Sequence, residues 1–220
     1  TSVGGQTANN LTPKLAKNGI KLIGTSADDV DKAEDRSRFS QVLDSLHIMQ
    51  PAWQAFSNLQ DAKNFALEVN YPVLVRPSYV LSGAAMKVVW SQEELKKFVN
   101  QATTLSPDHP VVITKFMLGA LEVDVDGVCD GKNVIIGAIV EHIDSAGVHS
   151  GDAMMCIPPW RLSNKILDNI TDSTNRIAKE FKIKGPFNLQ FLIKDDQAYV
   201  IELNIRASRS MPFVSKFIKT

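Results

Sequence analysis

Residues 187–209 read FNLQFLIKDDQAYVIELNIRASR, two apolar runs on either side of a polar stretch, and this pattern predicts a β-hairpin. A turn of three residues, Asp195-Asp196-Gln197, would bring polar side chains of the two runs opposite one another. The resulting pairs are Gln190 with Glu202 and Asn188 with Asn204. Because side chains alternate along a strand, all four belong to one face of the hairpin.

The two faces of this hairpin differ in chemistry. The face expected in the core is wholly apolar and consists of Phe187, Leu189, Phe191, Ile193, Tyr199, Ile201, Leu203 and Ile205. The other face presents amide and carboxylate oxygens, the ligands that a hard cation such as Mg²⁺ prefers. Arg206 and Arg209 follow directly, and their forked guanidinium groups suit phosphate oxygens. The alternative is a solvated polar face, which many antiparallel sheets have.

The composition argues against several classes of protein. Of 220 residues, 44% are hydrophobic and 22% are charged, as in an ordinary soluble α/β protein. Lys and Arg together number 24, as do Asp and Glu, so no overall field favours nucleic acid or an anionic membrane. No apolar run approaches the roughly 20 residues that span a bilayer. Cys129 and Cys156 have no CxxC spacing, which favours reduced thiols over a disulfide or a zinc site.

The start of the chain predicts the end of one domain and a helix leading into another. The sequence begins with Thr1 inside a strand-turn-helix pattern, so we expect a piece of a longer protein whose targeting signal lies elsewhere. Residues 4–19 predict an amphipathic helix and residues 20–26 a short strand, together the last βαβ element of a nucleotide-binding type of domain. Residues 28–48 predict a single helix.

The remaining segments predict two α+β lobes. The expected helices are residues 59–69, 91–103 and 163–181. The expected strands are residues 71–77, 86–90 and 110–117, followed by a hairpin over residues 121–143. Ser91 is the expected N-cap of its helix, with Glu94 three residues on. The turn of the 121–143 hairpin is expected at Asp130-Gly131.

Two further segments could contact a nucleotide. The loop 78–85 has little side-chain bulk and could offer backbone N–H groups to phosphates, with Arg76 at the strand end beneath it. A backbone edge after Lys115 and Met117 could hold a base, and Glu122 a ribose. The alternatives are an ordinary hairpin loop, a surface arginine, and a solvent-facing strand with alternating acidic residues.

The segment GVHSGD brings His149 and Ser150 into one loop. His149 has no cysteine or second histidine nearby, so a hydrogen-bonding role in a substrate loop is favoured over a metal site. GxSxG, HExxH and Walker A patterns are absent, which leaves serine hydrolase, zincin and P-loop chemistry unsupported.

Together these segments resemble one family, the large subunit of carbamoyl phosphate synthetase, in its second, carbamate-phosphorylating half. The motifs that carry the resemblance are VGGQTANN, KAEDRSRFS, YPVLVRPSYVLSGAAM, EVDVD, EHIDSAGVHSGD, FNLQF and ELNIRASRSMPFVSK. They occur in the family's order and cover essentially the whole chain. SYVLSGAAM and PFVSK resemble the second half of this duplicated subunit, because the first half has a glycine-richer phosphate loop and a different ending.

The resemblance implies the α+β class and the ATP-grasp fold, whose two α+β lobes clamp ATP, preceded by the end of a Rossmann-like pre-ATP-grasp domain. Residues 1–33 would belong to that preceding domain. Residues 34–118 would form a linker helix and the N-terminal lobe, and residues 119–220 the C-terminal lobe. The implied reaction transfers the γ-phosphoryl group of ATP to carbamate and yields carbamoyl phosphate and ADP.

The resemblance also implies roles for individual residues. ATP would be contacted by Arg36, Arg76, Lys115, Met117 (backbone), Glu122, Gly147, Val148, His149, Ser150, Gln190 and Glu202. Mg²⁺ or Mn²⁺ would be held by Gln190, Glu202 and Asn204. Arg206 would steady the transferred phosphoryl group, with Asn204 beside it at the catalytic centre.

The implied partners are ATP, carbamate, the other synthetase half and a glutaminase domain or subunit, with neither nucleic acid nor a membrane. The expected compartment is the cytoplasm, or the mitochondrial matrix, for pyrimidine, arginine or urea synthesis. Two alternatives remain: a nucleotide-binding remnant without turnover, and another ATP-grasp ligase such as a biotin carboxylase, against which SYVLSGAAM and PFVSK argue. Residues 158–163, PPWRLS, depart from the family and are expected to form a surface turn without functional consequence.

Overall fold

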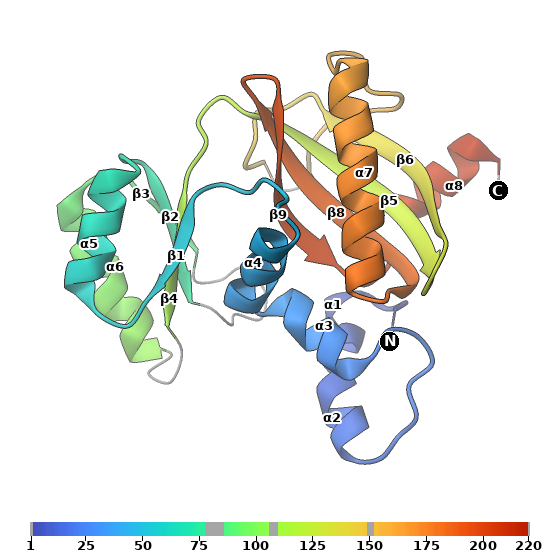
Figure 1. Cartoon of the computed structure of the whole chain (residues 1–220), viewed down its shortest axis with the longest axis horizontal. Helices are drawn as coiled ribbons and strands as arrows, with labels where there is room; N and C mark the ends of the chain where they lie inside the picture. Colours follow the sequence, from blue (N-terminus) through green and yellow to red (C-terminus); the bar gives the residue numbers. More distant parts are fainter. Residues whose placement is uncertain (1, 78–85, 106–109, 149–151, 220) are drawn as a thin grey trace.

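The computed structural model describes residues 2–77, 86–105, 110–148 and 152–219. Figure 1 shows two lobes, each with its own β-sheet, and helix α4 between them. The two sheets are antiparallel, and each has a separate hydrophobic core. The predicted pair of α+β lobes is therefore confirmed.

The smaller lobe is a four-stranded sheet in the order β1-β4-β2-β3. Its strands are β1 (Trp53–Phe56), β2 (Val73–Pro77), β3 (Lys87–Val89) and β4 (Val111–Lys115). Helices α5 (Leu59–Glu68) and α6 (Gln92–Leu105) lie on the side of this sheet that faces away from the larger lobe (Figure 1). The sequence predicted every one of these elements except β1, which is short.

The predicted cap of α6 is confirmed. Ser91 Oγ accepts a hydrogen bond from the backbone N–H of Glu94, at 3.3 Å. The Glu94 carboxylate accepts in return from the N–H of Trp90, one residue before the expected position, at 2.9 Å. These bonds satisfy backbone donors that have no partner within the helix.

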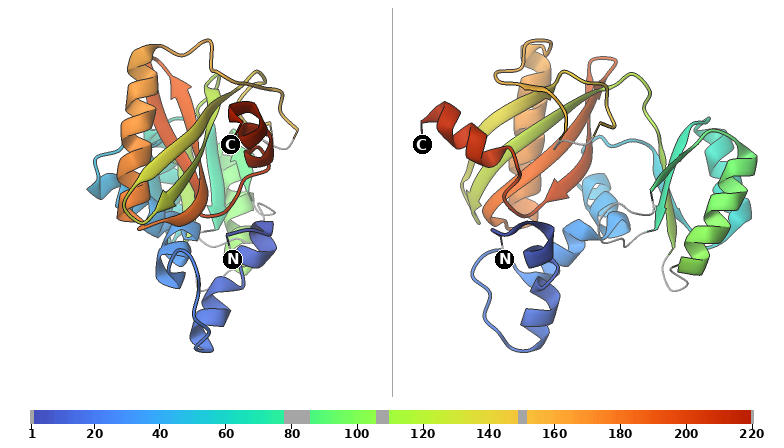
Figure 2. Two further views of the ribbon diagram at one scale, coloured as in Figure 1. Left: turned by 90° about the vertical axis from the view of Figure 1, so that its right-hand side faces the viewer. Right: turned by 180° about the vertical axis from the view of Figure 1, so that it is seen from behind.

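The larger lobe is a five-stranded sheet in the order β7-β6-β5-β8-β9. Its strands are β5 (Leu121–Asp130), β6 (Val134–His142), β7 (Met155–Cys156), β8 (Lys184–Lys194) and β9 (Gln197–Asn204). Figure 2 shows α7 (Asn164–Glu180) on one face of this sheet and α8 (Met211–Ile218) on the other. The main core lies under α7, where its buried side chains meet the apolar side chains of β5 and β8.

The hairpin of β8 and β9 contains the predicted polar pairs. Asn188 is opposite Asn204, and Gln190 is opposite Glu202. These pairs share the face of the sheet that does not contact the core under α7, as the period of two requires. The sequence therefore predicted these two polar pairs correctly.

The turn of this hairpin is shorter than predicted. Lys194 pairs with Gln197, so the turn contains only Asp195 and Asp196, with φ angles of 49° and 57°. Two-residue turns with positive φ match the twist of the strands, and Asp tolerates this conformation. A register shift after Gln190 leaves Ile201 as an extra residue of β9, a β-bulge that restores the polar pairs.

The bulge changes which residues of β9 reach the core. Ala198 and Val200 are buried, whereas Tyr199 and Ile201 are only partly buried. The prediction for Tyr199 and Ile201 is therefore wrong, because an extra residue reverses the alternation of faces between turn and bulge. The other six predicted core residues are buried: Phe187, Leu189, Phe191, Ile193, Leu203 and Ile205.

The leading segment differs from its predicted form. The expected helix 4–19 is two short helices, α1 (Gly5–Asn9) and α2 (Thr12–Lys17). No strand forms over the described residues 20–26, where Ile20 and Ile23 are 53% and 92% exposed, because no neighbouring strand pairs with this segment.

The expected helix 28–48 is also divided, into α3 (Ala27–Glu34) and α4 (Arg36–Ser45). The break falls at Asp35, which has an extended backbone, with φ −77° and ψ 111°. Its side chain accepts a hydrogen bond from the N–H of Arg38 at 2.9 Å and so caps α4. Asp35 therefore starts a new helix where the periodic pattern predicted continuation.

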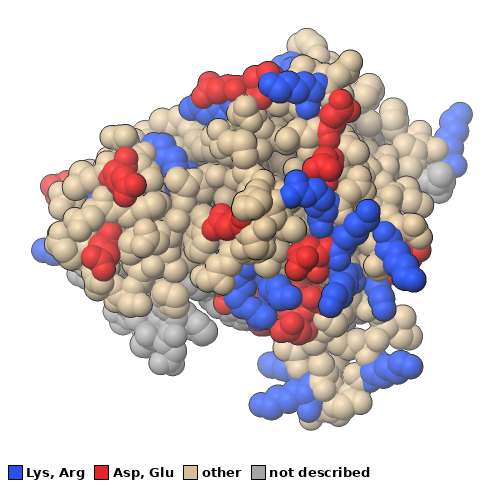
Figure 3. Space-filling model, viewed as in Figure 1, with Lys and Arg blue, Asp and Glu red and all other residues tan. Residues whose placement is uncertain are grey.

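The charge distribution agrees with the balanced composition. On the face that Figure 3 shows, Lys and Arg side chains are interspersed with Asp and Glu side chains over the larger lobe. Among the helices of the described residues, none combines the length and the apolar character needed to cross a bilayer.

The turn 158–163 lies at the surface, as predicted, and also contacts a buried carboxylate. The backbone N–H groups of Trp160 and Arg161 donate to Glu141 Oε2 at 2.9 and 3.1 Å. The Arg161 guanidinium also donates to Glu141 and to the carbonyl oxygen of His142. Glu141 is 0% exposed, and a buried carboxylate is stable only with such donors. The turn thus has a structural role that the sequence did not predict, while the absence of a functional consequence stays a prediction.

Because the pKa of Glu141 is shifted, we expect this residue to stabilise the fold in a pH-dependent way. Burial raises the pKa of Glu141, but the hydrogen bonds from Arg161 and Trp160 outweigh burial and hold the pKa below its usual range. A carboxyl group with a lowered pKa stabilises the fold above its unfolded pKa, and this contribution is lost as the pH falls through the folded pKa. We therefore expect the wild-type chain to lose more unfolding free energy than Glu141→Gln between about pH 5 and pH 3.

Urea unfolding at a series of pH values measures this difference. At pH 7, Glu141→Gln should be less stable by about 2 kcal/mol, because one acceptor oxygen becomes an NH₂ group that faces N–H donors and the other loses its charge. Glu180→Gln, an exposed change at the end of α7, is the control and should follow the wild-type curve. Parallel pH curves for the wild-type chain and Glu141→Gln would contradict the prediction.

Candidate functional site

Strand β5 carries carboxylates on the face of the larger sheet that does not contact the core under α7. Glu122, Asp124 and Asp126 alternate with core residues and are only 7%, 2% and 0% exposed. Asp124 is opposite Gln190, and Asp126 is opposite Asn188, so β5 extends the polar face of the hairpin. The alternative of a solvent-facing acidic strand is wrong, because this face is buried.

One of these carboxylates pairs with a histidine of the next strand. Asp124 Oδ2 lies 3.1 Å from Nε2 of His142, which is 0% exposed. Burial lowers the pKa of His142, but the hydrogen bond and charge of Asp124 outweigh burial and raise the pKa overall. The second ring nitrogen of His142 and Asp124 Oδ1 are buried without a hydrogen-bond partner. Each of these atoms could therefore bind a ligand or water.

Asp126 fixes the segment between β9 and α8 to the sheet. Its Oδ1 accepts hydrogen bonds from Asn188 Nδ2 at 3.0 Å and from Ser208 Oγ at 2.6 Å. Its Oδ2 accepts from Ser210 Oγ at 2.5 Å. Because Asp126 is wholly buried, these bonds anchor residues 206–210, which carry both arginines that the sequence suggested for phosphate.

Glu122 contacts one of the segments that the sequence assigned to ATP. Its Oε2 accepts a hydrogen bond from the N–H of Gly147 at 3.1 Å. Burial raises the pKa of Glu122, and the hydrogen bond from Gly147 partly offsets this. Val148 is 38% exposed, and its N–H lies 3.3 Å from the carbonyl oxygen of Ser145. His149 and Ser150 lie outside the described residues.

Arg36 contacts Glu202 of β9, and the charge of Arg76 acts on the same region. Arg36, at the start of α4, lies with Nη2 3.9 Å from Glu202 Oε2 and also donates to the carbonyl oxygen of Ile201. Burial and the nearby Arg36 lower the pKa of Arg76, whereas Glu202 raises it; the net pKa lies well below the usual range. The Nε of Arg76 is buried without a hydrogen-bond partner.

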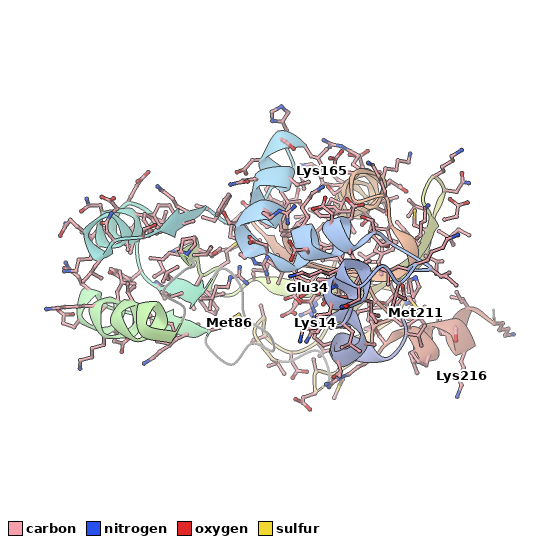
Figure 4. The ribbon with its side chains drawn as sticks, turned by 90° about the horizontal axis from the view of Figure 1, so that it is seen from below. Lys14, Glu34, Met86, Lys165, Met211 and Lys216 are labelled. Atoms are coloured by element: carbon pink, nitrogen blue, oxygen red, sulfur yellow. The ribbon has the colours of Figure 1, made fainter. Side chains whose placement is uncertain are left out.

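This arrangement favours an anionic ligand. Arg76 comes from the smaller lobe and Glu202 from the larger, and Arg36 lies on the helix between them. The terminal nitrogen Nη1 of Arg76 lies 4.0 Å from the sulfur of Met86, on the side of the smaller lobe that faces the larger lobe (Figure 4). Guanidinium groups close enough to repel one another are stabilised by a phosphate between them.

Asn204 and Arg206 contact one another at the end of β9. Arg206 Nη2 donates to Asn204 Oδ1 at 3.0 Å. Asn204 Oδ1 is the oxygen that the metal prediction would use, and the second lone pair of a carbonyl oxygen can still bind a cation. Arg209, in contrast, is exposed.

Two other residues predicted to contact ATP, Lys115 and Met117, make contacts away from Glu202 and the arginines. Lys115 Nζ donates to the carbonyl oxygen of Asn70 at 2.7 Å, which ties it to the end of α5. Burial and the nearby Lys194 lower the pKa of Lys115. Met117 lies in the connection between the two sheets, where its carbonyl oxygen accepts from the N–H of Ala120 at 3.4 Å. The predicted phosphate loop 78–85 lies outside the described residues.

Several site residues were not singled out from the sequence. Asp124, Asp126 and His142 are among them, although the period-two pattern of EVDVD already placed the two aspartates beside Glu122. The missing information was burial, since an alternating acidic strand has the same pattern whether its polar face meets solvent or protein. Gln6, whose Oε1 accepts a hydrogen bond from Arg206 Nε at 3.0 Å, lies in the VGGQTANN motif, but no role was predicted for it.

The predicted metal ligands suit a hard cation. Gln190, Glu202 and Asn204 would each bind a cation through oxygen, and the Glu202 side chain is 45% exposed and thus accessible. Within the part of the chain that the structure describes, no group of three His, Cys, Asp or Glu side chains could hold a metal by itself. A cation here would need further oxygen ligands from water or phosphate, which is typical of Mg²⁺.

Comparison with known proteins gives the family. Residues 35–218 match the family described as carbamoyl-phosphate synthase L chain, ATP binding domain. The chain is 51% identical to the carbamoyl phosphate synthase large chain of Sulfurisphaera tokodaii, over 99% of this chain and 21% of that protein. It is 54% identical to the mitochondrial carbamoyl-phosphate synthase (ammonia) of Homo sapiens, over 98% of this chain and 14% of that protein.

Solved structures give the fold. A biotin carboxylase complex from Campylobacter jejuni superposes with a TM-score of 0.81 at 22% identity, over 94% of this chain and 48% of that chain. The biotin carboxylase domain of a Hydrogenobacter thermophilus 2-oxoglutarate carboxylase, in complex with MgADP, gives a TM-score of 0.79 at 18% identity, over 96% and 48%. These likenesses confirm the expected ATP-grasp fold.

The chain thus spans about a fifth or less of the length of these curated relatives, and almost all of its own length takes part in each match. The family match covers α4, both sheets, and Arg36, Arg76 and Glu202. The chain belongs to the carbamoyl-phosphate synthase L chain ATP-binding family.

Proposed function

We propose that this chain transfers the γ-phosphoryl group of ATP to carbamate and so forms carbamoyl phosphate and ADP. Relatives at 51–54% identity over nearly the whole chain are carbamoyl phosphate synthases, which supports this choice among ATP-grasp activities. SYVLSGAAM and PFVSK support the second synthetase half of such a protein. The biotin carboxylases share the fold at 22% identity or less, which carries no argument for their reaction.

The observation that supports phosphoryl transfer most strongly is the contact of Arg36 with Glu202 where the two lobes meet, together with the buried, unpartnered Nε of Arg76. Phosphoryl transfer depends on positioning and on neutralising charge more than on a covalent residue. Buried guanidinium groups can hold the phosphates of ATP in one place and exclude water from them. Arg206, at the end of β9, would donate to the phosphoryl group as its charge develops.

Glu202, Gln190 and Asn204 would hold the divalent cation that accompanies ATP, Mg²⁺ or Mn²⁺. Such a cation, when bound, bridges phosphate oxygens and neutralises part of their charge. The protein contributes one carboxylate and two amide oxygens, so much of the coordination is left for substrate and water. The weak contact of Glu202 with Arg36, at 3.9 Å, leaves this carboxylate able to turn toward a cation.

The proposal also concerns the partners of this chain and its compartment. Carbamate must come from another reaction, so we place the chain beside a first synthetase half and a glutaminase domain or subunit. Cys129 and Cys156 are free thiols, which supports a reducing compartment such as the cytoplasm or the mitochondrial matrix.

Glu202→Ala tests this function directly. The reverse reaction, ATP formation from ADP and carbamoyl phosphate, avoids the unstable carbamate and is measured in the full-length protein with Mg²⁺. We expect Glu202→Ala to lower this rate by roughly 10²-fold or more, because it removes the charged ligand of the cation. The melting temperature should change little, since Glu202 is outside the core.

Asp172→Ala is a matched control, because it removes an exposed carboxylate from α7, on the opposite face of the sheet. It should keep the wild-type rate. A wild-type rate in Glu202→Ala would contradict the metal assignment. A wild-type protein that binds ATP but never forms it from carbamoyl phosphate and ADP would contradict carbamate phosphorylation and favour a nucleotide-binding remnant.

A further inference from the structure

Arg206 is held by contacts that occupy only part of its guanidinium group. Its Nε donates to Oε1 of Gln6 at 3.0 Å, and its Nη2 donates to Asn204 Oδ1 at 3.0 Å. Its Nη1 lies 3.4 Å from the carbonyl oxygen of Ala207. Because a guanidinium group has five N–H donors, these contacts leave one N–H on each terminal nitrogen for a phosphate.

Gln6 is itself fixed in orientation. Its Nε2 lies 3.1 Å from both carboxylate oxygens of Glu34, at the end of α3, and 3.0 Å from Asn10 Oδ1. An amide whose nitrogen faces a carboxylate must present its oxygen in the other direction, toward Arg206. Figure 4 shows Glu34 near the middle of the molecule, close to the leading helices.

The backbone places Gln6 beside the end of β9. Ala207 donates its N–H to the carbonyl oxygen of Ser2 at 2.9 Å, so the two segments run side by side. Gly4 and Gly5 then turn the chain into α1 with φ angles of 118° and 68°, a conformation that favours glycine. A Cβ atom on Gly4 would approach the Cβ of Ala8 to 3.0 Å, so the turn that carries Gln6 has little freedom.

We propose that Gln6 is a positioning residue for phosphoryl transfer, which acts by holding the guanidinium plane of Arg206 through Nε. Glu34 orients the amide of Gln6, and Gln6 orients Arg206 so that its two remaining terminal donors face one way. The leading segment would thereby take part in the chemistry of the larger lobe. This inference rests on the proposed role of Arg206.

A purely structural role for Gln6 predicts a different outcome. If Gln6 only joins α1 to the rest of the chain, its removal lowers stability and leaves the rate per folded molecule unchanged. If it positions Arg206, its removal lowers kcat more than it changes KM for ATP, because the bond to Arg206 matters most as charge develops. The loss of kcat caused by removing Gln6 should also vanish in a variant whose residue 206 has no Nε to donate to Gln6.

A double-mutant cycle in the full-length protein tests the proposal. The variants are Gln6→Met, which keeps the side-chain volume without an acceptor, Arg206→Lys, which keeps the charge without Nε, and the combination. Forward and reverse phosphoryl transfer are measured with Mg²⁺. We expect Gln6→Met to lower kcat about tenfold, with KM for ATP within about twofold. Arg206→Lys should cost roughly 10²-fold in kcat.

In the Arg206→Lys background, Gln6→Met should cost less than about twofold, since its partner is already lost. Asn9→Ala is the control for α1: Asn9 donates to Glu34 at 2.7 Å, as Gln6 does, and has no bond to Arg206 among the described contacts. It should keep the wild-type kcat even where its melting temperature falls.

Two outcomes would overturn the proposal while leaving the function of Arg206 intact. One is an unchanged kcat in Gln6→Met beside a strongly impaired Arg206→Lys. The other is a full tenfold loss from Gln6→Met in the Arg206→Lys background. An Arg206→Lys variant with the wild-type rate would instead contradict the proposed role of Arg206 itself, and the role of Gln6 with it.

Discussion

Buried carboxylates on β5 constrain how the larger lobe is built. Glu122, Asp124 and Asp126 are all nearly inaccessible, and a carboxylate in protein interior is stable only when hydrogen-bond donors surround it. The donors come from distant parts of the chain: the N–H of Gly147, the ring of His142, and the hydroxyl groups of Ser208 and Ser210. Glu122 and Asp126 therefore fix the places of two segments outside the strands, whereas Asp124 adds a side-chain contact between β5 and its neighbour β6.

Because side chains alternate along a strand, one face of this sheet packs into the core and the other carries the polar groups. Val123 and Val125 alternate with the carboxylates and pack into the core under α7, which supplies stability. The opposite face lies away from that core and can hold polar groups in fixed positions. A sheet that is stabilised on one face in this way can hold charged side chains in fixed positions on the other, as the proposed phosphoryl transfer requires.

The place of the two arginines relative to Glu202 depends on how the two lobes meet. Arg76 belongs to the smaller lobe and Glu202 to the larger, so their distance changes if the lobes move relative to one another. Arg36 is tied to β9 through the carbonyl oxygen of Ile201, the bulged residue. The β-bulge thus has two effects on the polar face. It restores the pairing of Gln190 with Glu202, and it leaves the carbonyl oxygen of Ile201 free to accept a hydrogen bond from Arg36.

The sequence predicted the local elements of both lobes and the polar pairs of the hairpin, because these depend on period, capping and turn residues. It failed where a tertiary contact decided the outcome. Nothing local distinguished a two-residue turn with a bulge at Ile201 from a three-residue turn without one. Likewise, the partner of Arg161 is Glu141, twenty positions away in the chain, and spacing alone does not reveal such a pair.

In the candidate site too, residue types could be interpreted from the sequence, whereas burial and long-range contacts could not. The residue types of Gln190, Glu202, Asn204 and Arg206 already indicated a cation and a phosphate. The burial of Asp124 and Asp126 could not be predicted, since an alternating acidic strand occurs equally in solvated sheets. The contact between Gln6 and Arg206 joins the two ends of the chain, and it became visible only in the folded structure.

The central claim is that the polar face of β5, β8 and β9 holds a divalent cation and the phosphates of a nucleotide between the lobes. A crystal of the protein grown with Mn²⁺ and a non-hydrolysable ATP analogue tests it, because manganese is located by its anomalous scattering. The account predicts a manganese peak bound by Glu202, with Gln190 or Asn204 as a further ligand and the phosphates against Arg36 and Arg76. A peak coordinated away from Glu202, or an analogue whose phosphates avoid both arginines, would contradict it.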